Sequence, residues 1–170
     1  MRTFYACLIA LAVFFNIGPA DAVDNVAAST QLAGDFRSQM SLDEWKAHAK
    51  RAGFTWQVAE NQMVEAKEER PRFSNIRIVV QVFTDLGESG EAHFQFFNER
   101  LMAIRYFPND FIGYKSNLWR SKGAQADKAE ILIEPSTRVY IAQDFRGLRF
   151  ICFEDMALVR NMNNWIARYS

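Results

Sequence analysis

The sequence predicts an α+β domain with an antiparallel sheet of about six to seven strands and helices packed on one face. Two observations support this class. Apolar residues recur at helical spacing in three segments, at residues 42–52, 111–118 and 158–169, and they alternate with polar residues in several segments between these. Short turns rather than long crossovers join most of the alternating segments, which favours antiparallel pairing.

The first 22 residues have the pattern of a cleavable export signal. Arg2 supplies the positive charge, residues 4–15 are apolar, and residues 20–22 form the small-x-small sequence that precedes a cleavage site. The apolar run is shorter than the ~20 residues of a membrane-spanning helix, so we expect no integral membrane anchor. We therefore expect a periplasmic or secreted protein.

Two further regions follow the signal. Residues 23–40 contain few large apolar side chains, which predicts a loosely ordered lead-in. Residues 41–170 have a suitable length for a single α+β domain with one core.

The first helix is the most clearly marked element. Ser41 and Glu44 have the spacing of a capping box, Met40 and Trp45 that of a hydrophobic staple, and Gly53 can end the helix. Alternation from Phe54 to Ala59 then predicts the first strand.

The central strands follow a charged segment that ends at Pro71. Alternation over residues 76–82 stops at the turn-rich segment 85–90, which predicts a hairpin with a strand at 92–96. A further strand is expected at 101–107, where Pro108 ends it.

The second half begins with a helix that Asn109 or Asp110 can cap and that Gly123 can end. Three strands are expected at about residues 129–134, 138–143 and 148–153. The last helix is expected to begin near Asp155 and to continue almost to the C-terminus.

Residues 101–106 and 148–153 share the pattern Leu-x-x-Ile-x-aromatic, each after a tight turn and before a helix. The chain therefore also fits two α-β-β-β repeats followed by a C-terminal helix. This layout resembles that of exported inhibitor proteins that bind enzymes with a concave sheet, which is a likeness of fold alone.

Charge and composition narrow the function. The 20 basic and 20 acidic residues give a formal net charge of zero, which argues against a nucleic-acid partner or binding to an anionic membrane surface. After signal cleavage Cys152 is the remaining cysteine, so no internal disulfide is expected. Its apolar surroundings predict a buried thiol, whereas the alignment of the two repeats places it on the outward face of the sheet.

No sequence pattern predicts catalysis or metal binding. His48, His93 and Cys152 do not have the spacing of metal ligands, and no serine lies in a glycine-rich nucleophile turn. We therefore expect no catalytic residues, metal or cofactor.

The outward face of the sheet is the candidate recognition surface. If the helices cover one set of alternating residues, the other set faces away, and it is rich in aromatic and polar side chains. Protein interfaces are enriched in aromatic residues and arginine. The candidate partner-binding residues are Phe83, His93, Gln95, Phe97, Arg105 and Tyr140. A charged residue in place of Phe97 would then abolish binding with little loss of stability.

The sequence thus predicts an exported, non-enzymatic binding protein of the inhibitor, immunity or accessory type, with a protein partner in the cell envelope or the medium. One alternative is a small-ligand or lipid-binding module of the envelope, which a closed apolar pocket would favour. A second alternative is a small hydrolase that uses His93 with Cys152 or a carboxylate.

Overall fold

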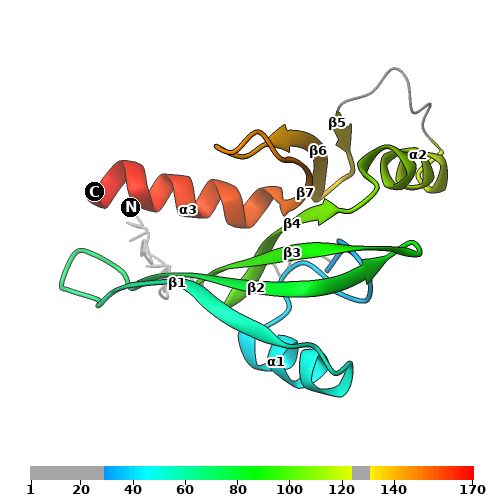
Figure 1. Cartoon of the computed structure of the whole chain (residues 1–170). Helices are drawn as coiled ribbons and strands as arrows, with labels where there is room; N and C mark the ends of the chain where they lie inside the picture. Colours follow the sequence, from blue (N-terminus) through cyan, green and yellow to red (C-terminus); the bar gives the residue numbers. More distant parts are fainter. Residues whose placement is uncertain (1–28, 124–130) are drawn as a thin grey trace, which may run out of the picture.

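The computed structural model describes residues 29–123 and 131–170 (Figure 1). Over these ranges it contains three helices and one antiparallel sheet of seven strands, which confirms the α+β class. The predicted signal peptide lies outside the described residues. The elements are α1 (Leu42–Arg51), β1 (Trp56–Val64), β2 (Phe73–Asp85), β3 (Glu88–Phe97), β4 (Arg100–Pro108), α2 (Phe111–Ser121), β5 (Ile131–Ile133), β6 (Thr137–Gln143), β7 (Arg149–Asp155) and α3 (Met156–Tyr169).

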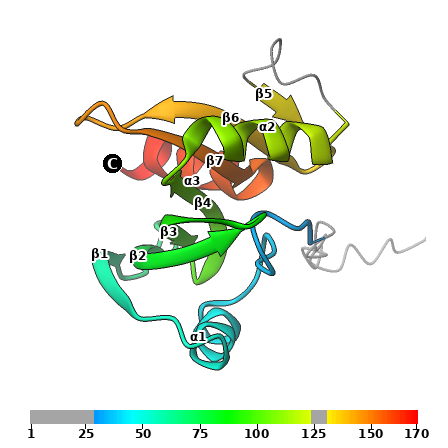
Figure 2. The same cartoon turned by 45° about the vertical axis from the view of Figure 1, so that its right-hand side comes forward.

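The strand order is β1-β2-β3-β4-β7-β6-β5, so β4 and β7 form the centre of the sheet. Figure 2 shows β1, β2 and β3 on one side of β4, and β5, β6 and β7 on the other. The two segments with the shared sequence pattern pair with each other in β4 and β7, with Ile104 opposite Phe153 and Tyr106 opposite Ile151. This arrangement does not confirm a duplication.

The helices lie on both faces of the sheet. α1 and α2 pack on one face, where Trp45 and Tyr114 are buried in the main core cluster, whereas Leu158 of α3 lies in a second cluster. Phe96 and Phe97, consecutive in β3, belong to the first and second cluster respectively, so the two clusters lie on opposite faces. Figure 1 shows α1 and α3 on opposite sides of the β2–β3 hairpin. Packing of all helices on one face is therefore not confirmed, because α3 follows β7 without a loop and crosses to the other face.

The segment before α1 is part of the core. Leu32 and Phe36 are buried, and the ring of Phe36 lies 4.7 Å from that of Phe94. The backbone pairs with β4, where Gln39 N donates to Leu101 O at 3.0 Å. The predicted loose lead-in is thus wrong for residues 29–40, because two large apolar side chains are enough to anchor a short segment when both are buried.

Asp85 joins three parts of the fold at the end of β2. Its carboxylate accepts hydrogen bonds from Gly34 N at 3.0 Å and from the Tyr114 hydroxyl of α2. Burial raises the pKa of Tyr114, so its hydroxyl stays protonated and remains a donor. Asp85 therefore links the N-terminal segment, β2 and α2.

Three strands contain a one-residue irregularity. The register shifts at Ala59 in β1, at residues 81–82 in β2 and at Met102 in β4. A bulge of this kind puts two neighbouring residues on one face and inverts the alternation beyond it. Phe83 consequently turns into the main core, while Val82 is 72% exposed.

Candidate functional site

One face of the sheet is covered by α1 and α2. On the opposite face, α3 covers one part, and we call the part that it leaves uncovered the open face. The strand register places on it His93 and Gln95 of β3, Arg105 and Phe107 of β4, Phe150 and Cys152 of β7, and Tyr140 of β6. Four of the six predicted partner-binding residues lie here, namely His93, Gln95, Arg105 and Tyr140.

The other two predicted residues are in the core. Phe83 is 1% exposed in the main cluster because the β2 bulge reverses its side. Phe97 does lie on the face opposite α1, but it is 5% exposed because α3 covers that end of the sheet. Neither ring is accessible to a partner.

His93 forms a pair with a carboxylate. Its Nε2 lies 2.6 Å from Glu91 Oε1, and its ring lies 4.9 Å from that of Phe107. Burial lowers the pKa of His93 below the ordinary value, and the hydrogen bond to Glu91 opposes this shift without cancelling it. The imidazole is therefore mainly neutral at pH 7.

Polar side chains at the centre of the open face form hydrogen bonds with one another. Glu154 is buried, accepts from Arg138 Nε at 2.7 Å and accepts from the Tyr140 hydroxyl at 3.1 Å. Gln95 Nε2 donates to Asn75 Oδ1 at 3.0 Å. A partner that used these groups would first have to break existing hydrogen bonds.

Cys152 is both on this face and buried, which reconciles the two expectations for it. It is 1% exposed in a cluster with Ala103 and Phe150, and Phe107 and Tyr140 pack against the cluster. Burial raises the pKa of the thiol to about 11. The protonated form predominates at neutral pH, which is unfavourable for a cysteine nucleophile.

His93 and Cys152 are not neighbours in the sheet. His93 lies opposite Arg105 of β4, and Arg105 lies opposite Cys152 of β7, so a whole strand separates the two. His48 is on α1 and contacts Phe36 on the other side of the sheet. Within residues 29–123 and 131–170, no three or more His, Cys, Asp or Glu side chains are grouped to hold a metal ion.

A cleft of about 670 Å³ lies at one end of the sheet, between the open face and the start of α2. It is bordered by β2 and β3, by the junction of β4 with α2, and by the turn between β6 and β7, residues 144–148, which we call the β6–β7 turn. Its lining includes Val82, Glu91, Phe107, Phe111, Arg146, Leu148 and Arg149.

The β6–β7 turn is held by one carboxylate. Asp144 accepts hydrogen bonds from Arg146 N, from Arg146 Nε and from Leu148 N, each at 2.9 Å. Gly147 adopts a φ of +80°, which favours glycine. The turn is therefore ordered, yet the side chain of Phe145 is 97% exposed.

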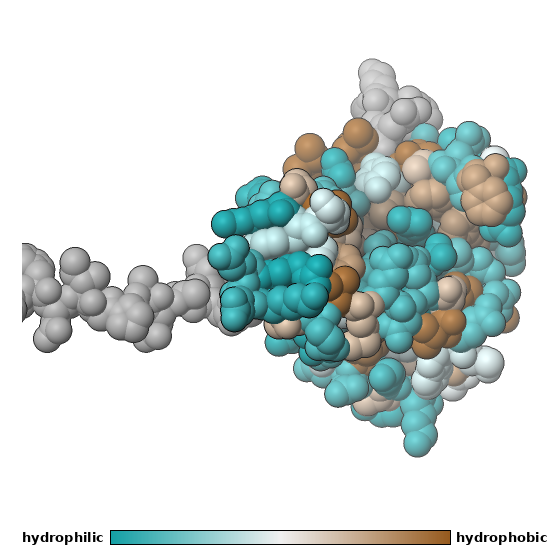
Figure 3. All heavy atoms as spheres, turned by 90° about the vertical axis from the view of Figure 1, so that its left-hand side faces the viewer, coloured by the Kyte–Doolittle hydropathy of each residue, from teal (hydrophilic) through white to brown (hydrophobic). Residues whose placement is uncertain are grey.

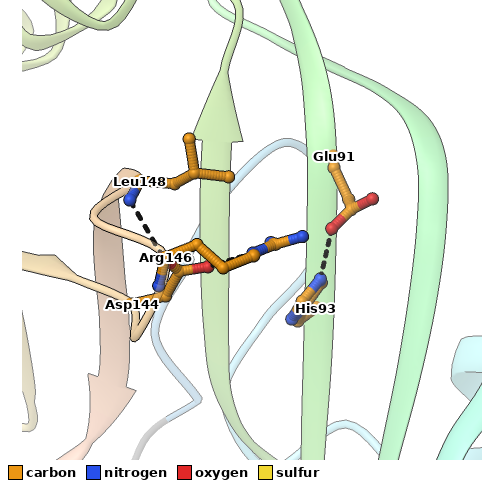
Figure 4. A network of polar contacts seen from close by, with 5 residues as sticks. All are labelled: Glu91, His93, Asp144, Arg146 and Leu148. Carbon is orange, nitrogen blue, oxygen red and sulfur yellow. Dashed lines mark hydrogen bonds and ion pairs between the residues drawn. The ribbon is translucent and has the colours of Figure 1, made fainter.

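Two arginines line the cleft next to this turn. Arg146 extends from the turn over β4 towards Glu91 and His93 of β3 (Figure 4). The guanidinium of Arg149 lies 4.2 Å from the ring centroid of Phe111, within the range of a cation–π contact. Both arginines are exposed, so both can reach a bound partner.

Sequence reasoning missed the cleft. Its residues come from four separate stretches of chain, and alternation along strands does not show which turns meet. One signal was present: Phe145 lies in a predicted turn next to Arg146, where a large aromatic side chain is unusual for a purely solvated turn.

The view in Figure 3 shows the side of the molecule at the left of Figure 1. Hydrophilic side chains dominate it, and hydrophobic ones are scattered between them. Among the described residues, no helix has both the length and the apolar character needed to cross a membrane. Comparisons of the chain with protein-family models, with curated proteins and with solved structures found no match.

Proposed function

We propose that this chain is an exported, non-enzymatic binding protein of the inhibitor, immunity or accessory type, and that it recognises a protein partner with the β6–β7 turn, which forms the rim of the cleft. The observation that carries this proposal is Phe145. Its ring is 97% exposed on a turn that Asp144 keeps ordered. Burying such a ring in an interface would contribute about 1.5–3 kcal/mol, and little ordering of the backbone would oppose binding.

The neighbours of Phe145 support the same surface. Arg146 lies over the Phe145 ring, with Cζ 5.7 Å from the ring centroid, and Val82 and Leu148 are 72% and 49% exposed at the cleft. Aromatic residues and arginine are enriched among the residues that dominate binding energy at interfaces. The centre of the open face is less suited, because Glu154 and Gln95 already have hydrogen-bond partners.

Affinity capture tests this proposal. The bait is the protein purified after export of the full chain, and it is presented to envelope and medium fractions as wild type, as Phe145→Asp and as Met63→Asp. Met63 is 51% exposed on β1, away from the cleft, and serves as the matched control. We expect a stoichiometric partner that the wild type and Met63→Asp retain and that Phe145→Asp loses. A partner that Phe145→Asp retains at the wild-type level would contradict the proposal.

The second candidate is a small-ligand or lipid-binding module of the envelope. The specific observation in its favour is the cleft volume of about 670 Å³, which lies in the range of small-molecule sites. The lining is mixed, however, with Arg146, Arg149 and Glu91 beside the apolar residues. An empty capture, together with a stoichiometric small molecule extracted from the purified protein, would favour this candidate over the first.

We also propose that the chain contains two related units followed by α3: α1 with the four strands β1 to β4, and α2 with the three strands β5 to β7. The second unit has the α-β-β-β layout, and the first has one strand more. Two observations support this. The shared sequence pattern falls in the paired strands β4 and β7, and α1 and α2 contribute to the same core cluster. On this view the cleft forms where the two units meet.

A further inference from the structure

We infer that the cleft binds an acidic segment of the partner protein, with carboxylates on Arg146 and Arg149 and an apolar side chain beside them. This inference rests on the proposed function, since it assumes that the ligand of the cleft is a protein. It specifies the chemistry of the partner that would fit.

Arg149 is the first reason. Phe111 supports its guanidinium from one side, and none of the ion pairs among the described residues involves Arg149. A guanidinium that rests on an aromatic ring is held in place by a contact that uses none of its N–H donors. Arg149 can therefore give a carboxylate two parallel hydrogen bonds at a small entropic cost.

Arg146 is the second reason. Its Nε donates to Asp144, which fixes the side chain and leaves the two terminal nitrogens of the guanidinium for a ligand. These nitrogens point across β4 into the space beside Glu91 (Figure 4). Glu91 Oε1 already accepts a hydrogen bond from His93 Nε2 at 2.6 Å, and no ion pair joins Glu91 to Arg146 among the described residues.

The charges at the cleft favour an anion over a cation. Among its lining residues, Arg146 and Arg149 carry positive charge and Glu91 carries negative charge. Arg146 is paired with Asp144 of the turn and Glu91 is hydrogen-bonded to His93, whereas Arg149 has no ion pair among the described residues and is the charge left for a ligand. A basic segment would meet two guanidinium groups, whereas an acidic segment would be attracted to both.

The apolar side chains that line the cleft indicate which residues would accompany the carboxylates in the bound segment. Val82 and Leu148 are exposed at the cleft, and Phe107 and Phe111 are half-buried in its wall. A segment in which Asp or Glu alternates with Phe or Leu would place charges on the arginines and apolar side chains on this wall.

Short fluorescein-labelled peptides test the inference by fluorescence anisotropy with the protein purified after export of the full chain. One peptide alternates Asp and Glu with Phe and Leu, a second carries Lys in place of every acid, and a third carries Gly in place of every apolar residue. We expect the first to bind at least about 10-fold more tightly than either of the others, with an affinity that falls as salt is added. Equal binding of the acidic and basic peptides would overturn the inference.

Substitutions in the protein test whether the acidic peptide binds at the cleft. Arg149→Glu should lower the affinity for the acidic peptide by about 10-fold or more, whereas Arg160→Glu on the exposed side of α3 should leave this affinity unchanged. Arg149→Gln provides a second variant if the charge reversal lowers the melting temperature. Unchanged binding by a folded Arg149 variant would contradict the inference, as would inorganic phosphate or acetate that competes as tightly as the peptide binds.

The two proposals fail separately. A captured partner that Phe145→Asp loses and Arg149→Glu retains would leave the binding-protein function in place and reject the acidic segment. Binding of the acidic peptide at Arg149, combined with a partner that is insensitive to Phe145→Asp, would instead reject the proposed use of the rim.

Discussion

Phe97 belongs to the core beneath α3, where its ring lies 5.7 Å from that of Phe73. The Phe97→Asp substitution would put a carboxylate into an apolar cluster and remove an aromatic side chain. We expect the free energy of unfolding to fall by at least about 3 kcal/mol. Urea unfolding followed by tryptophan fluorescence measures this, with Phe145→Asp as the matched control, for which we expect a change within about 0.5 kcal/mol. A nearly unchanged midpoint for Phe97→Asp would show that the ring is accessible after all.

His93 gives the stability a dependence on pH. Burial lowers the pKa of His93 in the folded state below its ordinary value of 6.5. A histidine shifted downwards contributes stability that is complete above the unfolded pKa of about 6.5 and is lost as the pH falls through the folded pKa. We therefore expect the melting temperature to fall between about pH 7 and pH 5, and to fall less in His93→Gln. Identical pH profiles for the two proteins would refute this assignment.

At individual positions, the sequence was informative where the strand was regular. His93, Gln95, Arg105 and Tyr140 lie on the face expected from alternation. Phe83 does not, because the bulge in β2 precedes it, and a bulge leaves no mark in the hydrophobic pattern. Alternation therefore predicted which strand residues lie on the open face, but none of the six predicted residues lines the cleft.

Among the elements, those with local end signals were predicted best. The capping box is present, with Ser41 N donating to Glu44 Oε2 at 2.7 Å and Glu44 N donating to Ser41 Oγ at 3.2 Å. Asp110 and Asp155 cap α2 and α3 as expected. A capping signal depends on residues close together in the sequence, so it can be found without knowing the tertiary structure.

Elements whose ends depend on tertiary contacts were predicted less well. β1 continues to Val64, beyond the expected end at Ala59, because an edge strand that is largely exposed on both faces shows no alternation. The face on which α3 packs was also missed. It depends on how the helix leaves β7 rather than on the apolar stripe of the helix itself.

For the molecule as a whole, contacts over long sequence separations connect the two ends of the described chain. Gln39 Nε2 donates to Asp155 Oδ2 at 2.8 Å, and the hydroxyls of Thr30 and Ser136 lie 2.5 Å apart. These contacts, together with the continuous seven-stranded sheet, join the two described ranges to each other.

We therefore expect the protein to unfold in one cooperative transition. Urea unfolding should give the same midpoint by tryptophan fluorescence and by far-ultraviolet circular dichroism. Phe36→Ala, which removes the ring that packs the N-terminal segment on the core, should lower both midpoints equally. Two separated transitions, or a Phe36→Ala effect seen by one probe alone, would show that the halves unfold independently.

The docking of residues 29–40 also sets an order of events in time. The segment precedes the rest of the described fold in the chain, yet its hydrogen-bond partners Ser136 and Asp155 are more than a hundred positions further along. Phe36 can pack on Phe83 and Phe94 earlier, but the segment gains these two hydrogen bonds only when nearly all of the domain is available, and closing so long a loop slows the step. Leu32 and Phe36, buried in the finished fold, are therefore apolar groups that stay exposed to chaperones or to aggregation until the β2–β3 hairpin has formed.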